Sequence, residues 1–360
     1  GDMSGDVFGN GMLLSRHIRL LAAFNHQHIF IDPDPDPATS FLERQRLFKL
    51  PRSSWTDYNK KLISKGGGIF DRAAKSIKLS PEIQKRFAIQ SASITPNDLM
   101  RHLLRAEVDL LWLGGIGTYV KAVSESNLDA GDRANDALRV DATELRCKVF
   151  GEGANLGITQ RGRVEYALGG GRLNADSVDN SAGVNCSDHE VNIKILLNEV
   201  VASGKLTEQK RNVLLARMTK EVSSLVLRDN YLHTQAITYV ASRASDFLDG
   251  QAALIRTLEG KGLLDREIEF LPSDAVIEER LMARQGLTRP EIAVLISYAT
   301  NWLYSALLES DVPDDPFLAA GLTSYFPAPL RADFARRISS HRLRREIIAT
   351  QVANGLITRM

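Results

Sequence analysis

The sequence has few cysteines, no excess of charge of either sign, and no long uncharged apolar segment. Its two cysteines, Cys147 and Cys186, are too few for a disulfide framework, so we expect reduced thiols in a cytoplasmic protein. Lys and Arg number 45 against 44 for Asp and Glu, which gives no general attraction to nucleic acid or to an anionic membrane. No run of about 18 uncharged apolar residues is present, so no membrane-spanning helix is expected.

The composition is that of a globular protein. Of the 360 residues, 44% are hydrophobic and 25% are charged, which supports more than one hydrophobic core and argues against disorder. At about 150 residues per domain, this length predicts two or three domains. The sequence opens in a glycine-rich loop and closes in a helix-like pattern without an evident cap, so we expect a segment of a longer protein.

Residues 1–190 alternate short apolar runs with helix-like segments. Residues 12–24 have apolar side chains at helical spacing, and residues 28–32 form a short β-rich run that ends in an acid. Two later apolar runs, at 108–113 and 145–150, each stop at glycines. Continuous apolar runs of this length predict strands buried on both faces, and hence a parallel sheet. We therefore predict an α/β fold with a Rossmann-like, doubly wound, mostly parallel sheet, whose first strand would precede Gly1.

Residues 191–360 have mostly helical periodicity and predict an all-α domain. Val213, Met218 and Val226 belong to one apolar helical stripe. Hydroxyl residues followed by proline or acid predict helix starts in both halves of the chain. These starts are at Ser80, Thr95 and Thr288. The proline-rich tracts at 33–37 and 311–316 predict loops.

The opening glycine loop, GDMSGDVFGNG, precedes a helical segment as a dinucleotide-binding loop does. Asp32 follows Gly9 by about 23 residues, against an expected separation of about 20 for the acid that accepts hydrogen bonds from the adenosine ribose. That carboxylate would repel a 2′-phosphate, so NAD is favoured over NADP. The loop lacks the G-x-G-x-x-G spacing, since Val7 and Met12 replace two glycines, and a flexible glycine turn is the alternative interpretation. The candidate cofactor-binding residues of the loop are Gly5, Asp6, Gly9, Asn10 and Gly11.

Three further segments carry candidate site residues. Gly114 and Gly115 follow an apolar run and would let a flat ring approach, although a plain tight turn is the better interpretation of this segment taken alone. The segment Glu152-Gly153-Ala154-Asn155 follows the next run, and the Asn155 amide suits a carboxamide or a ribose hydroxyl, with an Asx turn as the alternative.

The third segment is residues 180–190, which lead into a helix expected near 189–203. Ser187 and Glu190 have the spacing of a capping box, and a serine at a helix N-terminus is also placed to receive a carboxylate. His189 has no metal-ligand spacing to another His or Cys, so a surface or packing role is expected and no metal site is predicted.

Several long segments resemble the large bacterial NAD-specific glutamate dehydrogenases, over nearly all of the chain. They are GDMSGDVFGNGMLLS, SSWTDYNKKLISKGGGIF, DLLWLGGIGTYVKA, GLTRPEIAVL and CKVFGEGANLGITQRGRVEYALGGGRLNADSVDNSAGVNCSDHEVNIKILL. The resemblance implies oxidative deamination of L-glutamate to 2-oxoglutarate and ammonia, with a hydride passed to NAD. It implies the coenzyme domain plus part of a C-terminal helical region of a protein expected to form a homo-oligomer.

The resemblance also implies residue roles. Asn155 would lie near the nicotinamide ribose, Asn180 would approach nicotinamide and substrate, and Ser187 would hold the substrate α-carboxylate. The lysines and aspartate that activate glutamate belong to an upstream substrate domain, so the catalytic residues are expected outside this chain. Asp188 and His189 replace the aromatic residues that follow the serine in smaller enzymes.

Two other readings remain open from the sequence. One is an amino-acid dehydrogenase of the same superfamily that acts on leucine, valine or phenylalanine. The other is a helical regulatory or interaction module with a degenerate nucleotide-binding fold.

Overall fold

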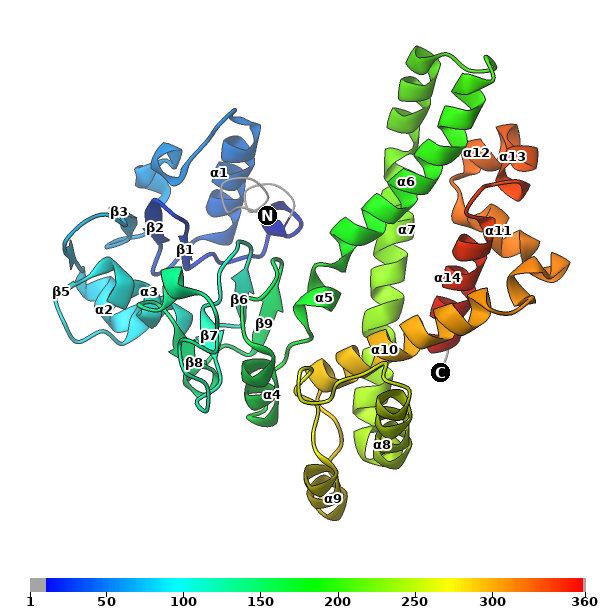
Figure 1. Ribbon diagram of the computed structural model, residues 1–360. Helices are drawn as coiled ribbons and strands as arrows, with labels where there is room; N and C mark the ends of the chain where they lie inside the picture. The colour runs from blue at the N-terminus through cyan, green and yellow to red at the C-terminus, as the bar shows by residue number, and fades with distance from the viewer. Residues whose placement is uncertain (1–10, 359–360) are drawn as a thin grey trace. The chain divides into compact units, whose positions relative to one another are not determined.

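The computed structural model describes residues 11–358, which form two compact units (Figure 1). The first unit ends at Asp176 and combines short strands with helices, and the second begins at Ser177 and is helical. An α/β part followed by a helical part is the coarse fold class that the sequence predicts.

Residues 12–24 do not form the helix that their apolar spacing predicts. Only the first two residues are helical, and Ala22–Phe24 is strand β1, which pairs antiparallel with β2 (His28–Ile31). The Asn25 side chain accepts hydrogen bonds from two backbone N–H groups that follow it, at 2.9 and 2.8 Å. This asparagine turn closes a hairpin, and pairing of β1 with β2 overrides the helical spacing of the apolar side chains.

Strand β2 confirms the β-rich run at residues 28–32 and is the centre of a three-stranded sheet of order β1-β2-β3. β3 (Gly68–Asp71) pairs with the other side of β2, also antiparallel. The prediction of parallel neighbours is therefore wrong for this sheet. For β1 and β2 the reason is the short turn between them, which can join only antiparallel strands. The proline-rich tract after β2 is a loop as predicted, and it leads into α1 (Pro37–Lys49).

Two capped helices and a small strand pair complete the core below this sheet. β4 (Ile77–Lys78) and β5 (Ser93–Ile94) are antiparallel. Ser80 caps α2 (Pro81–Phe87) and Thr95 caps α3 (Pro96–Leu104), which confirms both predicted helix starts. Their apolar faces pack against the buried side of β2 in one hydrophobic cluster.

Two parallel strand pairs form the rest of the first unit. β6 (Leu110–Leu113) pairs with β9 (Val149–Glu152), which confirms parallel pairing between the two later apolar runs. β7 (Val120–Lys121) pairs with β8 (Val140–Asp141), and α4 (Gln160–Leu168) follows β9. The expectation of burial on both faces is wrong for β6, because Leu110 and Trp112 are 54% and 51% exposed on a face that no described element covers.

The helical unit is built around two long helices. α6 and α7 pack against each other, α10 packs against both α7 and α14, and α11 packs against α14 (Figure 1). Met218 and Val226 of α7 are buried as the apolar stripe predicts, whereas Val213 is exposed. The helices from the end of the first unit onward are α5 (Asp176–Asp179), α6 (Ser181–Ala202), α7 (Glu208–Ser242), α8 (Ala244–Gly260), α9 (Asp274–Met282), α10 (Arg289–Leu308), α11 (Ala319–Tyr325), α12 (Ala328–Asp333), α13 (Ala335–Ser339) and α14 (Arg344–Ile357).

The start of α10 has a complete capping box. Glu291 accepts hydrogen bonds from the Thr288 backbone N–H and hydroxyl, both at 2.7 Å. Arg280 of α9 donates two hydrogen bonds to the same carboxylate, at 2.8 and 3.0 Å. The predicted helix start at Thr288 is therefore confirmed, and a buried arginine strengthens it.

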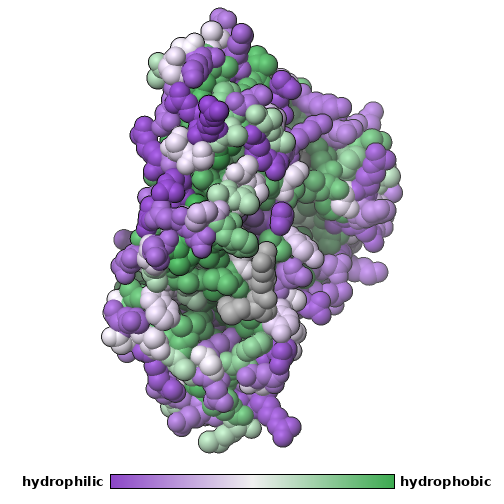
Figure 2. Space-filling model, turned by 90° about the vertical axis from the view of Figure 1, so that its right-hand side faces the viewer, coloured by the Kyte–Doolittle hydropathy of each residue, from purple (hydrophilic) through white to green (hydrophobic). Residues whose placement is uncertain are grey.

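Apolar side chains are scattered on the surface as well as buried. On the face that Figure 2 shows, hydrophobic areas lie among hydrophilic side chains. Among all described residues, the exposed large apolar side chains include those of Ile116, Leu227 and Phe317. Within residues 11–358, no helix combines the length and the apolar character needed to cross a membrane.

Candidate functional site

The turns that follow β6 and β9 lie side by side. The backbone N–H groups of Gly153 and Ala154 donate to the Leu113 carbonyl, at 2.8 and 3.2 Å. The structure therefore brings Gly114 and Gly115, which follow Leu113, next to the segment that carries Asn155. This is the carboxyl end of a parallel strand pair, the place where α/β sheets bind ligands. Gly114 and Gly115 are half-buried, and Asn155 is exposed.

Glycine is needed in this segment because an indole ring lies directly against it. A Cβ atom on Gly151 or on Gly153 would lie 2.5 Å from the nearest ring atom of Trp112, which is closer than real Cβ contacts. Trp112 projects from β6 and is half exposed. At Gly151 and Gly153 the flat ring that the glycines accommodate is therefore the chain's own tryptophan.

Glu152, at the end of β9, is the acceptor of a buried hydrogen-bond cluster. It is 1% exposed and accepts from the backbone N–H groups of Gly157 and Ile158, at 3.0 and 3.3 Å. Arg163 of α4 donates to both of its oxygens, at 2.8 and 2.9 Å. Burial raises the pKa of Glu152, and Arg163 acts in the opposite direction. With its oxygens engaged by donors, this carboxylate holds the loop in place.

Asp176 adds a second anchor to the same loop. It accepts from the Leu156 backbone N–H at 2.8 Å, and it pairs with Arg163 at 3.1 Å. Sequence reasoning identified neither Arg163 nor Asp176. The available signal was an acid ending a buried strand with an arginine on the next helix, which many unrelated segments share.

Asp32 lies just after β2 and is 1% exposed. Its Oδ1 atom accepts hydrogen bonds from the backbone N–H and the hydroxyl of Ser64, the former at 3.2 Å. Its Oδ2 atom is buried and has no hydrogen-bond partner among the described residues. A buried carboxylate oxygen without a donor is costly, so this atom fits a role in accepting a ligand hydroxyl.

The glycine loop before Asp32 is only partly described. Gly5, Asp6, Gly9 and Asn10 lie outside the described residues. Gly11 is exposed, and an added Cβ would have no atom within 4 Å, so the described part of the loop shows no steric need for glycine at this position.

Asn180 directly precedes α6 and Ser187 lies in its N-terminal part, both in the helical unit. The prediction that Ser187 starts a helix is wrong, because α6 begins at Ser181 with Asn180 as its N-cap residue. The Ser187 hydroxyl donates to the Gly183 carbonyl at 3.1 Å, one turn back inside the helix. Capping-box spacing also occurs within helices, and a serine there satisfies its hydroxyl on the preceding turn.

The residues next to Ser187 join α6 to the C-terminal helices. His189 is buried and its ring stacks on Tyr325 of α11, with ring centroids 4.5 Å apart, so of the two expected roles it has the packing one and not the surface one. The Tyr325 hydroxyl donates to Asp188 at 2.8 Å and accepts from Asn192 at 2.8 Å. Burial, the largest cause, raises the pKa of Tyr325, so this hydroxyl stays protonated and able to donate.

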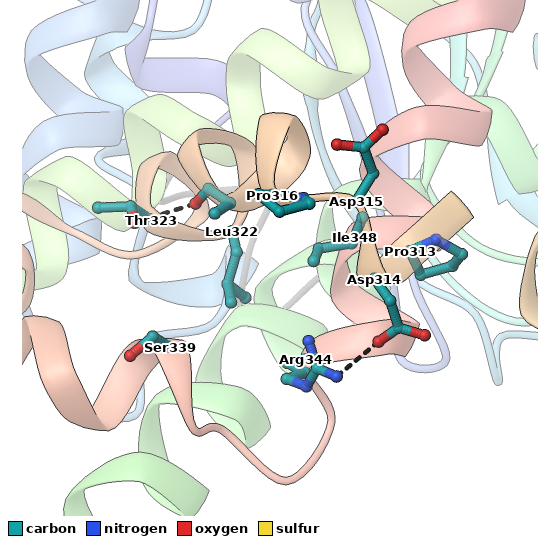
Figure 3. Close-up of a pocket in the computed structure, with 10 residues that line it drawn as sticks. Pro313, Asp314, Asp315, Pro316, Leu322, Thr323, Ser339, Arg344 and Ile348 are labelled. Carbon is teal, nitrogen blue, oxygen red and sulfur yellow. Dashed lines mark hydrogen bonds and ion pairs between the residues drawn. The ribbon is translucent and has the colours of Figure 1, made fainter. Parts of the chain in front are cut away.

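Two cavities among residues 11–358 lie apart from these candidates. One, of about 540 Å³, is lined by Cys147, Tyr166 and Gly169–Gly171 in the first unit. The other, of about 130 Å³, lies between α11 and α14, where Arg344 faces Asp314 across an ion pair (Figure 3). Neither is lined by a described candidate residue. No group of three or more potential metal ligands occurs among the described residues.

Comparison with known proteins identifies the family. The family model of the bacterial NAD-glutamate dehydrogenase catalytic domain matches residues 1–240, and that of the glutamate dehydrogenase C-terminal region matches 284–360. The chain is 57% identical over 360 residues to the NAD-specific glutamate dehydrogenases of Pseudomonas aeruginosa and Halomonas elongata. It is 50% identical over 363 residues to that of Mycobacterium tuberculosis.

These alignments cover 100% of this chain for the first two relatives and 99% for the third, but 22% of each relative. The chain therefore spans about a fifth of the length of the curated relatives it matches. The catalytic-domain match extends from the glycine loop through α6 and most of α7, so it includes every candidate residue considered above. The chain belongs to the family of bacterial NAD-glutamate dehydrogenases.

Proposed function

We propose that this chain is the coenzyme-binding portion of an NAD-dependent L-glutamate dehydrogenase. The full enzyme would deaminate L-glutamate oxidatively to 2-oxoglutarate and ammonia, with hydride transfer to NAD. The observation that carries this proposal is the 57% identity, over the whole chain, to proteins named NAD-specific glutamate dehydrogenases.

The described residues suit an NAD site. Asp32 would accept a hydrogen bond from the adenosine ribose through Oδ2, the buried oxygen without a partner among the described residues. Its negative charge would disfavour a 2′-phosphate and so discriminate against NADP. Gly114, Gly115 and Asn155 lie on adjacent turns and would bind the nicotinamide half. Bound NAD supplies the hydride acceptor. The residues of the glycine loop that would bind the pyrophosphate are Gly5, Asp6, Gly9, Asn10 and Gly11.

The substrate would be bound by residues of α6. Ser187 is exposed and would hold the glutamate α-carboxylate, and Asn180 would approach the nicotinamide and the substrate. The cofactor portion would then include residues 1–190, with residues 191–360 as the helical portion. The boundary proposed here, after residue 190, lies later in the chain than the boundary between the compact units, where the second unit begins at Ser177. The difference arises because Asn180 and Ser187 are assigned to the cofactor portion.

The remaining features of the proposal concern the whole enzyme. A doubly wound sheet would be completed by a strand that precedes this chain, and the catalytic lysine and aspartate would come from an upstream substrate domain. The chain alone would therefore bind NAD but turn over little glutamate. We propose a cytoplasmic homo-oligomer without nucleic-acid or membrane partners.

Two measurements test this proposal. The full-length protein should reduce NAD in the presence of L-glutamate, and should use NADP much more weakly. Calorimetry of this chain should show one NAD site, with much weaker NADP binding. Absence of glutamate-dependent NADH formation by the full-length protein would overturn the proposed activity. NAD binding only in the full-length protein would place part of the site outside this chain.

A further inference from the structure

The loop after β9 has a conformation that is fixed by two carboxylates. Glu152 accepts from the backbone N–H groups of Gly157 and Ile158, and Asp176 accepts from that of Leu156. Three consecutive amides of the loop thus point at two acids that lie on either side of it in the sequence. Asn155, immediately before these amides, is exposed.

The loop would not hold this conformation by backbone preference alone. Leu156 has a φ of 58°, in the left-handed region that residues with a side chain seldom adopt. A Cβ on Gly157 would lie 2.5 Å from Cδ1 of Leu113, so the loop also packs tightly against the end of β6. The hydrogen bonds to the acids therefore oppose a local strain.

Arg163 connects the two acids. Its guanidinium makes two hydrogen bonds to Glu152, at 2.8 and 2.9 Å, and an ion pair with Asp176 at 3.1 Å. Arg163 is 4% exposed and Glu152 is 1% exposed. A buried carboxylate keeps its charge only when it is paired, and an ionised carboxylate can only accept hydrogen bonds. Arg163 thereby keeps Glu152 available as an acceptor for the loop amides.

We propose that Arg163 is a positioning residue for the nicotinamide side of the cofactor site. It acts through Glu152 and Asp176 to fix the loop that presents Asn155, without itself touching the cofactor. This inference rests on the proposed function, because it assumes that Asn155 contacts NAD. It assigns a role in cofactor binding to a buried arginine that lies outside the candidate motifs.

The test is the Arg163→Lys variant of the full-length protein, assayed for glutamate-dependent NAD reduction. Lysine keeps the positive charge but lacks the planar fork that spans both oxygens of Glu152. We expect the KM for NAD to rise about tenfold while the KM for glutamate is unchanged, because a small displacement of a binding group is enough for such a loss. An unchanged KM for NAD would overturn the inference.

Arg280→Lys is the matched control. Arg280 is also buried and also makes two hydrogen bonds to one glutamate, Glu291, but it supports a helix start in the helical unit. It should destabilise its own surroundings without changing the KM for NAD. An equal rise in that KM for both variants would show a general effect of destabilisation and would overturn the inference. If Arg163→Lys does not fold, Asp176→Asn is the second variant, and it should raise the KM for NAD by a smaller factor.

Combining Arg163→Lys with Asn155→Ala separates the inference from the proposed function. If Arg163 acts through Asn155, the double variant should have the same KM for NAD as Asn155→Ala alone, because neighbouring groups that act as a unit are not additive. If the two substitutions raise the KM for NAD by factors that multiply in the double variant, the positioning role is overturned. The proposed enzyme activity would still stand in that case. A wild-type protein without glutamate-dependent NAD reduction would instead overturn the proposed function.

Discussion

The two units contain similar buried arginine–glutamate pairs that hold different kinds of backbone. Arg163 and Glu152 fix an irregular loop after a strand, whereas Arg280 and Glu291 complete the first turn of α10. In each pair the glutamate also accepts hydrogen bonds from a backbone N–H group. The same chemistry therefore secures a loop at the proposed cofactor site in one unit and a helix start in the other. A buried ion pair is best interpreted through the backbone that it holds.

Removal of each arginine should have the largest effect on the two units. Arg163→Ala and Arg280→Ala should each cost about 3–5 kcal/mol of local stability, because each leaves a buried carboxylate without its cation. Hydrogen exchange in urea should show the loss in the unit that carries the change. Only Arg163→Ala should expose the amides of residues 156–158 to rapid exchange. Loss of protection of these amides in Arg280→Ala would contradict the distinction.

A second comparison separates cofactor from substrate. Asp32→Ala should weaken NAD binding about 10- to 100-fold, the equivalent of a hydrogen bond to a charged group. Ser187→Ala should instead raise the KM for glutamate and leave NAD binding unchanged. Steady-state kinetics of the full-length variants measure both effects.

Asp34→Ala is the control for Asp32, since Asp34 lies two residues on, is 82% exposed and pairs with Arg19 at the surface. Asp34→Ala should change neither the affinity for NAD nor the KM for glutamate. If Asp34→Ala weakens NAD binding as much as Asp32→Ala, the effect does not come from the buried carboxylate.

The two cysteines give a comparison in which no residue is changed. Cys147 is buried in the first unit, within 3.3 Å of the Tyr166 hydroxyl, and burial raises the pKa of its thiol. A raised pKa means less thiolate at a given pH, so alkylation of Cys147 becomes appreciable only at higher pH. Cys186 is exposed on α6. Iodoacetamide should modify Cys186 at least about tenfold faster near pH 8, as mass spectrometry would show. Equal rates in the folded chain would contradict the burial of Cys147.

The smallest expected effects concern two helix caps. Thr159 caps α4 by accepting from the Gly162 N–H at 3.1 Å, and its hydroxyl also donates to Glu125. Thr207 caps α7 by accepting from the Lys210 N–H at 3.3 Å and is exposed. Replacement by alanine should cost about 1–2 kcal/mol at Thr159 and about 0.5 kcal/mol at Thr207. Urea unfolding of both variants measures the difference, and a larger loss at Thr207 would reverse the comparison.

Local signals predicted local structure well. The helix starts at Ser80, Thr95 and Thr288 depend on hydroxyl, proline and acid within four residues of each other, and the structure confirms them. The parallel pairing of β6 with β9 followed from apolar runs that end in glycine.

Features that depend on distant contacts were not predictable in this way. Residues 12–24 have side chains that suit a helix, but pairing with β2 decides their conformation. Ser187 has the spacing of a cap, yet the N-cap residue of α6 is Asn180, about two helical turns earlier. Arg163 gave no signal, since its role depends on the positions of Glu152 and Asp176 in the folded chain. The structure places the turns after β6 and β9 side by side, which the sequence did not predict, and adds the cluster that holds the second turn.

Trp112 gives the proposed cofactor site a built-in optical reporter. Its indole lies against Gly151 and Gly153 at the base of the two turns and is half exposed to solvent, whereas Trp55 is fully buried. A ligand that covers these turns would remove water from the indole and change its emission. We therefore expect intrinsic fluorescence to follow occupancy of the site in real time, without a label and without turnover.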